Sequence, residues 1–247
     1  MGCIEAGAIA LTSVVGGIHN IQLDASTMVE DFKSGGLADW SVAEYDFNHP
    51  HFDTDWRKHN VSLSKNGLTL TLRPHKDGSN PFEGAAIRRL QKSHFGRYSA
   101  TIRPAKGEGL VTGFFVYSGA AYGTRHDEID IEFLGKDTTK LHIASFVDGN
   151  LTNHFIDLGF DAAHETREYG FDWYPDSVSW WIDGCEVFRI ENEKNEVPEV
   201  PGYIFTNLWA VAPELDVWAG TPRAGTTAKA IFGKVTFTPL RAKASHD

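Results

Sequence analysis

The run from Arg125 to Gly135 constrains the fold of this chain more than any other part of the sequence. Within it, three carboxylates alternate strictly with three large apolar side chains: Glu128, Asp130 and Glu132 with Ile129, Ile131 and Phe133. A period of two places successive side chains on opposite faces of an extended strand, so the run predicts a β-strand with one acidic and one apolar face. Asp and Glu are poor strand formers, and like charges on one face repel one another. If these acids have only a structural role, their low strand propensity and mutual repulsion are an unexplained cost in folding free energy.

The remaining sequence predicts further strands and almost no helix. Val61 to Leu72 alternates around a Lys65-Asn66-Gly67 turn, and Ser177 to Ile190 alternates around the two-residue turn Asp183-Gly184. Both patterns are typical of β-hairpins. Turn signals recur along the chain, and no long segment shows helical periodicity. These features predict an all-β protein, a jelly-roll sandwich of two antiparallel sheets.

The length and the hydrophobic content of the chain fit a single domain with a full-sized core. The chain has 247 residues, of which 41% are hydrophobic, and all-β sandwiches often occupy this length as one domain. We expect a single domain over residues 28–240, an N-terminal segment over 1–27 that is a leader remnant or a first strand, and a short tail over 241–247. No apolar run reaches the roughly 20 residues that a membrane span requires. We therefore expect a soluble protein with no membrane partner. The expected location is secreted or extracellular, although the run from Ala6 to Ile18 is not clearly recognisable as a leader.

The charge and the cysteines exclude several functions. With 23 Lys and Arg against 33 Asp and Glu, the formal net charge is −10. No cluster of basic residues interleaved with aromatics is present, so nucleic acid is not an expected partner. As a separate expectation, the protein is a monomer. The two cysteines, Cys3 and Cys185, provide neither a disulfide framework nor a metal site. Nothing in the sequence sets them at a disulfide's Cα separation, so we do not expect them to pair.

The acidic face suggests chemistry on a glycosidic bond. Two carboxyls, one ionised and one protonated, are what such cleavage requires. On a flat strand Glu128 and Glu132 lie about 13 Å apart along the axis, whereas a retaining glycosidase needs roughly 5 to 5.5 Å between carboxyls. The pair works only if the side chains converge on a curved sheet, with Asp130 between them to shift a partner's pKa. The alternatives are a solvated acidic face or a calcium site, although calcium loops present their oxygens along a turn that contains a glycine.

The segment His126 to Lys140 resembles the signature strand of glycoside hydrolase family 16, in the non-bulged form of bacterial lichenases and plant xyloglucan endotransglycosylases. Further segments resemble lichenases in the same order, from about Trp40 to Phe237: Phe95 to Tyr98, Phe114 to Tyr117, Gly159 to Ala162, Phe171 to Trp173, Trp181 to Gly184 and Asn207 to Trp209. The resemblance implies a β-jelly roll with a substrate cleft across its concave sheet.

The resemblance also implies roles for individual residues. It makes Glu128 the nucleophile, Glu132 the general acid and then base, and Asp130 an assistant to both. The lichenase cleft residues correspond to a set with stacking and hydrogen-bonding side chains: Arg88, Phe115, Tyr117, Asn207 and Trp209. His126 replaces a lichenase Trp, as in the plant enzymes, and is expected to line the cleft or orient a neighbour. Trp218 resembles a residue of a lichenase loop and is either structural or functional.

Departures from lichenases concern the substrate and calcium. Ala86, Ala144 and Phe146 replace hydrogen-bonding or stacking residues, so the sugar subsites are remodelled. Gly233 stands where the family has an Asp, which leaves a structural calcium open, and we expect no cofactor in the chemistry. The first expected substrate is mixed-linkage β-1,3-1,4-glucan. The alternatives are a bacterial exopolysaccharide such as succinoglycan, cut by the rhizobial members that this branch resembles, a xyloglucan-type transglycosylation, and a lectin-like sandwich that binds glycans without cutting them.

Overall fold

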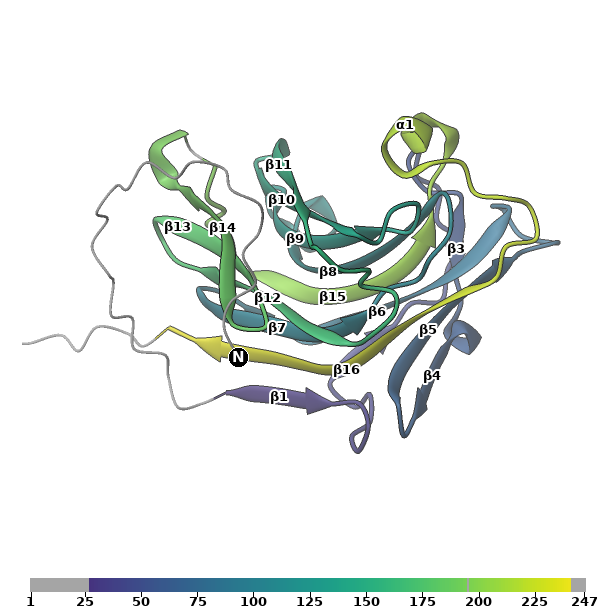
Figure 1. The fold of residues 1–247 in the computed structure, drawn as a ribbon, viewed down its shortest axis with the longest axis horizontal. Helices are drawn as coiled ribbons and strands as arrows, with labels where there is room; N and C mark the ends of the chain where they lie inside the picture. The colour runs from purple at the N-terminus through teal and green to yellow at the C-terminus, as the bar shows by residue number, and fades with distance from the viewer. Residues whose placement is uncertain (1–26, 195, 241–247) are drawn as a thin grey trace, which may run out of the picture.

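The computed structural model describes residues 27–194 and 196–240 (Figure 1). The predictions for the N-terminal segment and for the tail 241–247 therefore fall almost entirely outside the described residues. Two layers of antiparallel strands pack face to face, and they are joined along one edge by the pairing of Arg73 and Pro74 with Glu83 and Phe82. The predicted all-β sandwich is confirmed.

The first layer carries the acidic strand. Its order of hydrogen-bonded strands is β11 (Asn150–Asp157), β10 (Lys140–Val147), β9 (Asp127–Leu134), β8 (Leu110–Ser118), β15 (Gly202–Ala210) and β6 (Phe82–Ser93). Two short strands, β2 (Trp40–Val42) and β3 (Thr54–Trp56), add to β6, and β3 does so in parallel. They come from the segment 28–56, whose breakers Gly35-Gly36 and His49-Pro50 predict loop from sequence. Figure 1 shows this layer curved, with its concave face turned away from the second layer.

The second layer forms the back of the sandwich. It is ordered β5 (Gly67–Pro74), β16 (Ala228–Pro239), β7 (Gly96–Arg103), β12 (Arg167–Trp173), β13 (Ser177–Ile182) and β14 (Cys185–Glu191), with β1 (Met28–Asp31) on β16 and β4 (Val61–Ser64) on β5. Both predicted hairpins are confirmed as β4–β5 and β13–β14. Asp183 and Gly184 have φ of 48° and 80°, as a tight hairpin turn requires.

Helical structure is confined to short turns. Four 3-10 turns are present in the described residues, η1 (Lys58–Asn60), η2 (Ala120–Tyr122), η3 (Asn192–Lys194) and η4 (Pro213–Leu215), followed by α1 (Asp216–Ala219). The loop that carries α1 rises at one end of the concave face (Figure 1). Within the described part of the chain, no helix is long and apolar enough to cross a membrane.

The apolar face of the acidic strand enters the core between the layers. Ile129, Ile131 and Phe133 are fully buried in one hydrophobic cluster with residues of both layers. Burying a side chain of this size contributes about 1.5–3 kcal/mol. From the opposite layer, Nε1 of Trp180 donates a 3.0 Å hydrogen bond to the carbonyl of Asp130. The backbone between the two glutamates is thereby fixed from behind.

The cysteine prediction requires a correction. Cys185, at the start of β14, is disulfide-bonded in the structure. The expectation that it stays unpaired is wrong, because local sequence carries no information on the Cα separation that a disulfide requires. Cys3, the other cysteine of the chain, lies outside the described residues.

Candidate active site

The acidic strand presents its carboxylates on the concave face. Since the alternate residues of β9 are buried between the layers, Glu128, Asp130 and Glu132 point out of the other side of the sheet. The flanking strands place six residues on the same face, because directly paired residues of antiparallel strands share a face. They are Tyr117, Phe115 and Gly113 on β8, and Phe146, Ala144 and His142 on β10, opposite the three acids in that order.

The carboxyls of Glu128 and Asp130 are hydrogen-bonded to each other. Burial, followed by the charges of Glu128 and Glu132, raises the pKa of Asp130 well above its usual range. Burial also raises the pKa of Glu128, while the hydrogen bonds from His126 and Asp130 oppose that rise. The arrangement favours a proton on Asp130, donated to an ionised Glu128. One carboxyl is thus kept neutral beside a carboxylate, as nucleophilic chemistry on this strand would require.

We predict a pH-dependent stability gain in Asp130→Asn. Below the ordinary Asp pKa of 3.8, Asp130 is protonated in the folded and the unfolded chain, so parent and variant should unfold alike. At higher pH the unfolded chain releases this proton and the folded chain retains it, which destabilises the parent only. The Tm advantage of the variant should therefore grow between pH 4 and pH 8, by about 2–4 °C for each kcal/mol. Thermal unfolding followed by circular dichroism measures it, and a Tm difference that ignores pH would contradict the raised pKa.

His126 contacts the first glutamate directly. Its Nε2 donates a hydrogen bond to Oε2 of Glu128 over 2.7 Å, and its ring stacks on Phe146 at 4.7 Å. Tyr117 meets the same imidazole edge to face at 5.2 Å. His126 thus lies against Glu128, with its ring stacked on Phe146, and its orienting role stays a prediction.

Asn207 leaves an acceptor open beside the second glutamate. A Cβ added to Gly113, the residue opposite Glu132, would lie 2.6 Å from Oδ1 of Asn207, so a larger residue at 113 would displace this amide. Oδ1 of Asn207 is buried and has no hydrogen-bond partner among the described residues. An unpaired buried acceptor is costly, and a sugar hydroxyl would satisfy it.

Aromatic rings and a cation line the neighbouring strands. Phe115 stacks on Phe205 with ring centroids 5.1 Å apart and planes within 2°. The guanidinium of Arg88 lies 4.4 Å above the ring of Tyr203 and 5.4 Å from that of Tyr122. Arg88 is therefore held by cation–π contacts and by a 3.3 Å hydrogen bond from Nη1 to the carbonyl of Arg89, which leave its other N–H donors for a ligand. Phe205, Tyr203 and Tyr122 were not among the residues predicted from sequence.

Trp209 is placed differently from the other predicted binding residues. It lies on the same face of β15 as Asn207, but only 5% of its surface is exposed, because Phe52 stacks on it with ring centroids 3.9 Å apart. Together with Trp56 it forms a second small hydrophobic cluster, against which Trp218 packs partly exposed. This placement favours a packing role for Trp209 and leaves Trp218 as the more accessible indole.

Asp127 anchors the acidic strand from its opposite face. Burial opposes its charge, but hydrogen bonds from Arg125 and from the backbone amides of Asp148, Glu199 and Val200 outweigh burial and lower its pKa. The carboxylate joins the start of β9 to the β10–β11 turn and to the segment before β15. This fixes the strand end that carries Glu128.

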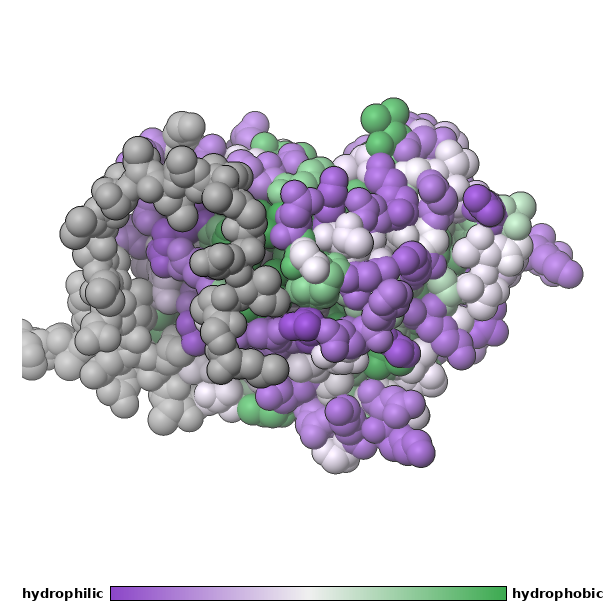
Figure 2. Space-filling model, in the orientation of Figure 1, coloured by the Kyte–Doolittle hydropathy of each residue, from purple (hydrophilic) through white to green (hydrophobic). Residues whose placement is uncertain are grey.

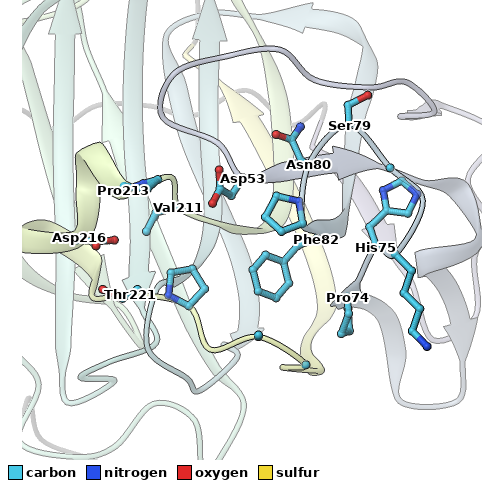
Figure 3. A pocket seen from close by; sticks show the side chains of 16 residues that line it. Asp53, Pro74, His75, Ser79, Asn80, Phe82, Val211, Pro213, Asp216 and Thr221 are labelled. Atoms are coloured by element: carbon cyan, nitrogen blue, oxygen red, sulfur yellow. The ribbon is translucent and has the colours of Figure 1, made fainter.

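A cavity of about 570 Å³ lies outside this site (Figure 3). Its lining residues come from the β5–β6 connection, the loop after β15 and the position just before β3, and they include Asp53, His75, Asn80, Asp216 and Thr221. None of its 16 lining residues belongs to β8, β9 or β10. The coloured part of the face drawn in Figure 2 is mostly hydrophilic, with small hydrophobic patches.

The position expected for calcium lacks an acidic ligand. Gly233 has no side chain, and its carbonyl already accepts a hydrogen bond from the amide of Phe32. A Cβ there would lie 2.6 Å from Oγ1 of Thr101 and 3.6 Å from Cε of Lys33, so the nearby charge is a cation. These residues do not fit a divalent metal, which prefers several oxygen ligands with negative charge.

The sandwich and the row of three carboxyls on its concave face are the fold and site of a glycoside hydrolase. A model of the glycosyl hydrolases family 16 matches residues 48–229, which is most of the chain. The chain belongs to glycosyl hydrolases family 16, as the resemblance of the acidic strand implied.

Relatives and solved structures agree with this membership. The chain is 39% identical over 194 residues to a beta-glucanase of Bacillus amyloliquefaciens, covering 78% of this chain and 79% of the relative. It superposes on the Bacillus licheniformis beta-glucanase with a TM-score of 0.80 at 36% identity, covering 86% of this chain and 97% of that one. A prokaryotic beta-1,3-1,4-glucanase (lichenase) from a mouse hindgut metagenome gives a TM-score of 0.81 at 34% identity, with 86% and 99% covered.

Proposed function

We propose that this protein is a retaining endo-glycanase that hydrolyses β-1,3-1,4-glucan by double displacement. The observation that carries the proposal is the row of three carboxyls on the concave face, Glu128, Asp130 and Glu132, in a family 16 chain. The relatives named beta-glucanases support the choice of a glucan. Ala86 and Ala144, small residues facing the same side, leave the substrate's exact linkages to experiment.

In the first step Glu128 attacks the anomeric carbon of the sugar. The bond from that carbon to the glycosidic oxygen breaks, and the carboxyl proton of Glu132 passes to the departing oxygen. A glycosyl ester on Glu128 and a carboxylate on Glu132 result. Asp130 donates its hydrogen bond to Glu128 before the attack and keeps that carboxylate oriented.

In the second step a water molecule attacks the same carbon from the side that the first sugar fragment has left. Glu132 takes a proton from this water, and the ester bond to Glu128 breaks. Glu128 returns as a carboxylate and Glu132 as an acid, so the site is regenerated. Two inversions give net retention at the anomeric carbon.

Substrate is held by the groups around this row. We propose that Phe115 and Tyr117 provide ring faces for sugars, while Arg88 and Asn207 bind hydroxyls. The unpaired Oδ1 of Asn207 supports its part, and the cation–π contacts of Arg88 support a fixed orientation. Aromatic faces and a few fixed polar groups are the usual composition of such sites.

The reaction as proposed needs no metal or cofactor. The polysaccharide is the proposed macromolecular partner, and the charge of −10 disfavours nucleic acid. Because the substrate is a polymer outside cells, we propose that the enzyme acts there, as a monomer.

A panel of defined polysaccharides tests the function. We expect new reducing ends and short oligosaccharides from mixed-linkage barley glucan, with the same rate in EDTA as in calcium. If reducing ends were released from succinoglycan and from no other polysaccharide, the substrate would be a bacterial exopolysaccharide. Transfer to added xyloglucan oligosaccharides in place of hydrolysis would favour a transglycosylase, and binding without release from any polysaccharide would overturn the enzyme assignment.

A further inference from the structure

A second histidine contacts the second glutamate. Nδ1 of His142, on β10, lies 3.0 Å from Oε2 of Glu132. The two residues are direct cross-strand partners, so their side chains leave adjacent strands on the same face. No other hydrogen bond to the Glu132 carboxyl is found in the described part of the chain. We propose that His142 is a positioning residue, which fixes the oxygen of Glu132 that carries the transferable proton; this rests on the proposed function.

The imidazole is held in place by rings on two other elements. Phe155 of β11 lies 4.8 Å from it, tilted, and Trp218 of α1 meets it edge to face at 5.3 Å. Only 5% of His142 is exposed. Phe155 and Trp218 also line a pocket of about 350 Å³. A side chain this confined costs little further entropy when it orients a partner.

The hydrogen bond from His142 gives the two carboxyl oxygens of Glu132 different roles. With its proton on Nδ1, His142 donates to Oε2, so the acidic proton of Glu132 belongs on Oε1. When that proton passes to the glycosidic oxygen, Glu132 becomes a carboxylate and the same hydrogen bond becomes charge-assisted and stronger. An interaction that strengthens as the proton leaves lowers the barrier to bond cleavage. His142 thereby acts on the step that needs leaving-group protonation.

Two substitutions separate this role from packing. His142→Phe keeps a ring between Phe155 and Trp218 but removes the donor, whereas His142→Asn places an amide nitrogen near the position of Nδ1. Both are compared with the parent on barley glucan and on an aryl β-glycoside series that ends in 2,4-dinitrophenyl, whose departure needs no proton. His154→Phe is the matched control, because His154 faces Phe188 at 4.1 Å and makes no contact with Glu132.

We expect His142→Phe to lower kcat/KM on glucan by about 10- to 100-fold and on the dinitrophenyl glycoside by less than about 3-fold, since general acid catalysis is worth about 10²- to 10⁴-fold. His142→Asn should recover most of the loss, and His154→Phe should leave the ratio of the two activities unchanged. Equal losses on both substrates, or none on glucan, would overturn the positioning role.

Failure of the proposed function would look different. A parent enzyme inactive on glucan would refute the substrate, yet the aryl series would still test His142. The inference then requires that log kcat/KM depends more steeply on leaving-group pKa in His142→Phe than in the parent. Parallel slopes would overturn it.

Discussion

Glu128→Ala is expected to abolish hydrolysis of glucan, lowering kcat by roughly 10⁴-fold or more, because the nucleophile of a covalent mechanism has no substitute. The variant should fold. Burial raises the pKa of Glu128, so its carboxylate is a cost to the folded state at neutral pH. Initial rates of reducing-end release measure the loss, and a Tm equal to or above the parent's shows that it is not caused by unfolding.

Azide then identifies which glutamate was removed. In Glu128→Ala, azide can enter the space left by the carboxylate and attack a 2,4-dinitrophenyl β-glycoside from that side. One inversion gives an α-glycosyl azide, whose anomeric coupling is read by NMR. A fully active variant, or a β-configured azide product, would contradict the assignment of Glu128 as the nucleophile.

Glu132→Ala is expected to lose glucan hydrolysis by about 10²- to 10⁴-fold while it still forms the glycosyl ester rapidly from the dinitrophenyl glycoside. Departure of dinitrophenolate needs no proton, whereas departure of a sugar alkoxide does. Hydrolysis of the ester should then be slow, because no base activates water, and a burst of dinitrophenolate should precede the steady state.

The same anion provides the matching control. Azide needs no base, so it should speed the second step in Glu132→Ala and yield a β-glycosyl azide, the opposite anomer to that from Glu128→Ala. If Glu132→Ala hydrolysed glucan as fast as the parent enzyme, Glu132 would not be the general acid. Identical anomers from the two variants would show that the two roles had been assigned wrongly.

Local sequence patterns predicted those features that depend on neighbours along the chain. The alternation over β9, the hairpins β4–β5 and β13–β14 and the all-β class all follow from a period of two and from turn residues. The three short strands between Met28 and Trp56 did not, because three or four residues carry too little alternation and depend on pairing with β6 and β16.

Features that depend on strand register were not predictable. His142 lies ten residues from Glu132, on the next strand, and only the β9–β10 pairing makes them partners. The stacking of Phe52 on Trp209 joins residues more than 150 positions apart, so an aromatic near the site could not be assigned to sugar or to core. The disulfide of Cys185 was missed because nothing local in the sequence reports the Cα separation of two cysteines.

Because β9 has one face in the core and one face in the site, its sequence tolerates little change, whereas nearby positions on other strands tolerate more. A slip of one residue would turn Glu128 and Glu132 into the core and bring Ile129 and Ile131 to the surface, so insertions within the strand should not be tolerated. Four positions on β10 and β15 have no such restriction, because they share the concave face with the acids and take no part in the proposed reaction: Ala144, Phe146, Tyr203 and Phe205. New polysaccharide preferences can therefore arise on β10 and β15 while the reacting strand stays the same.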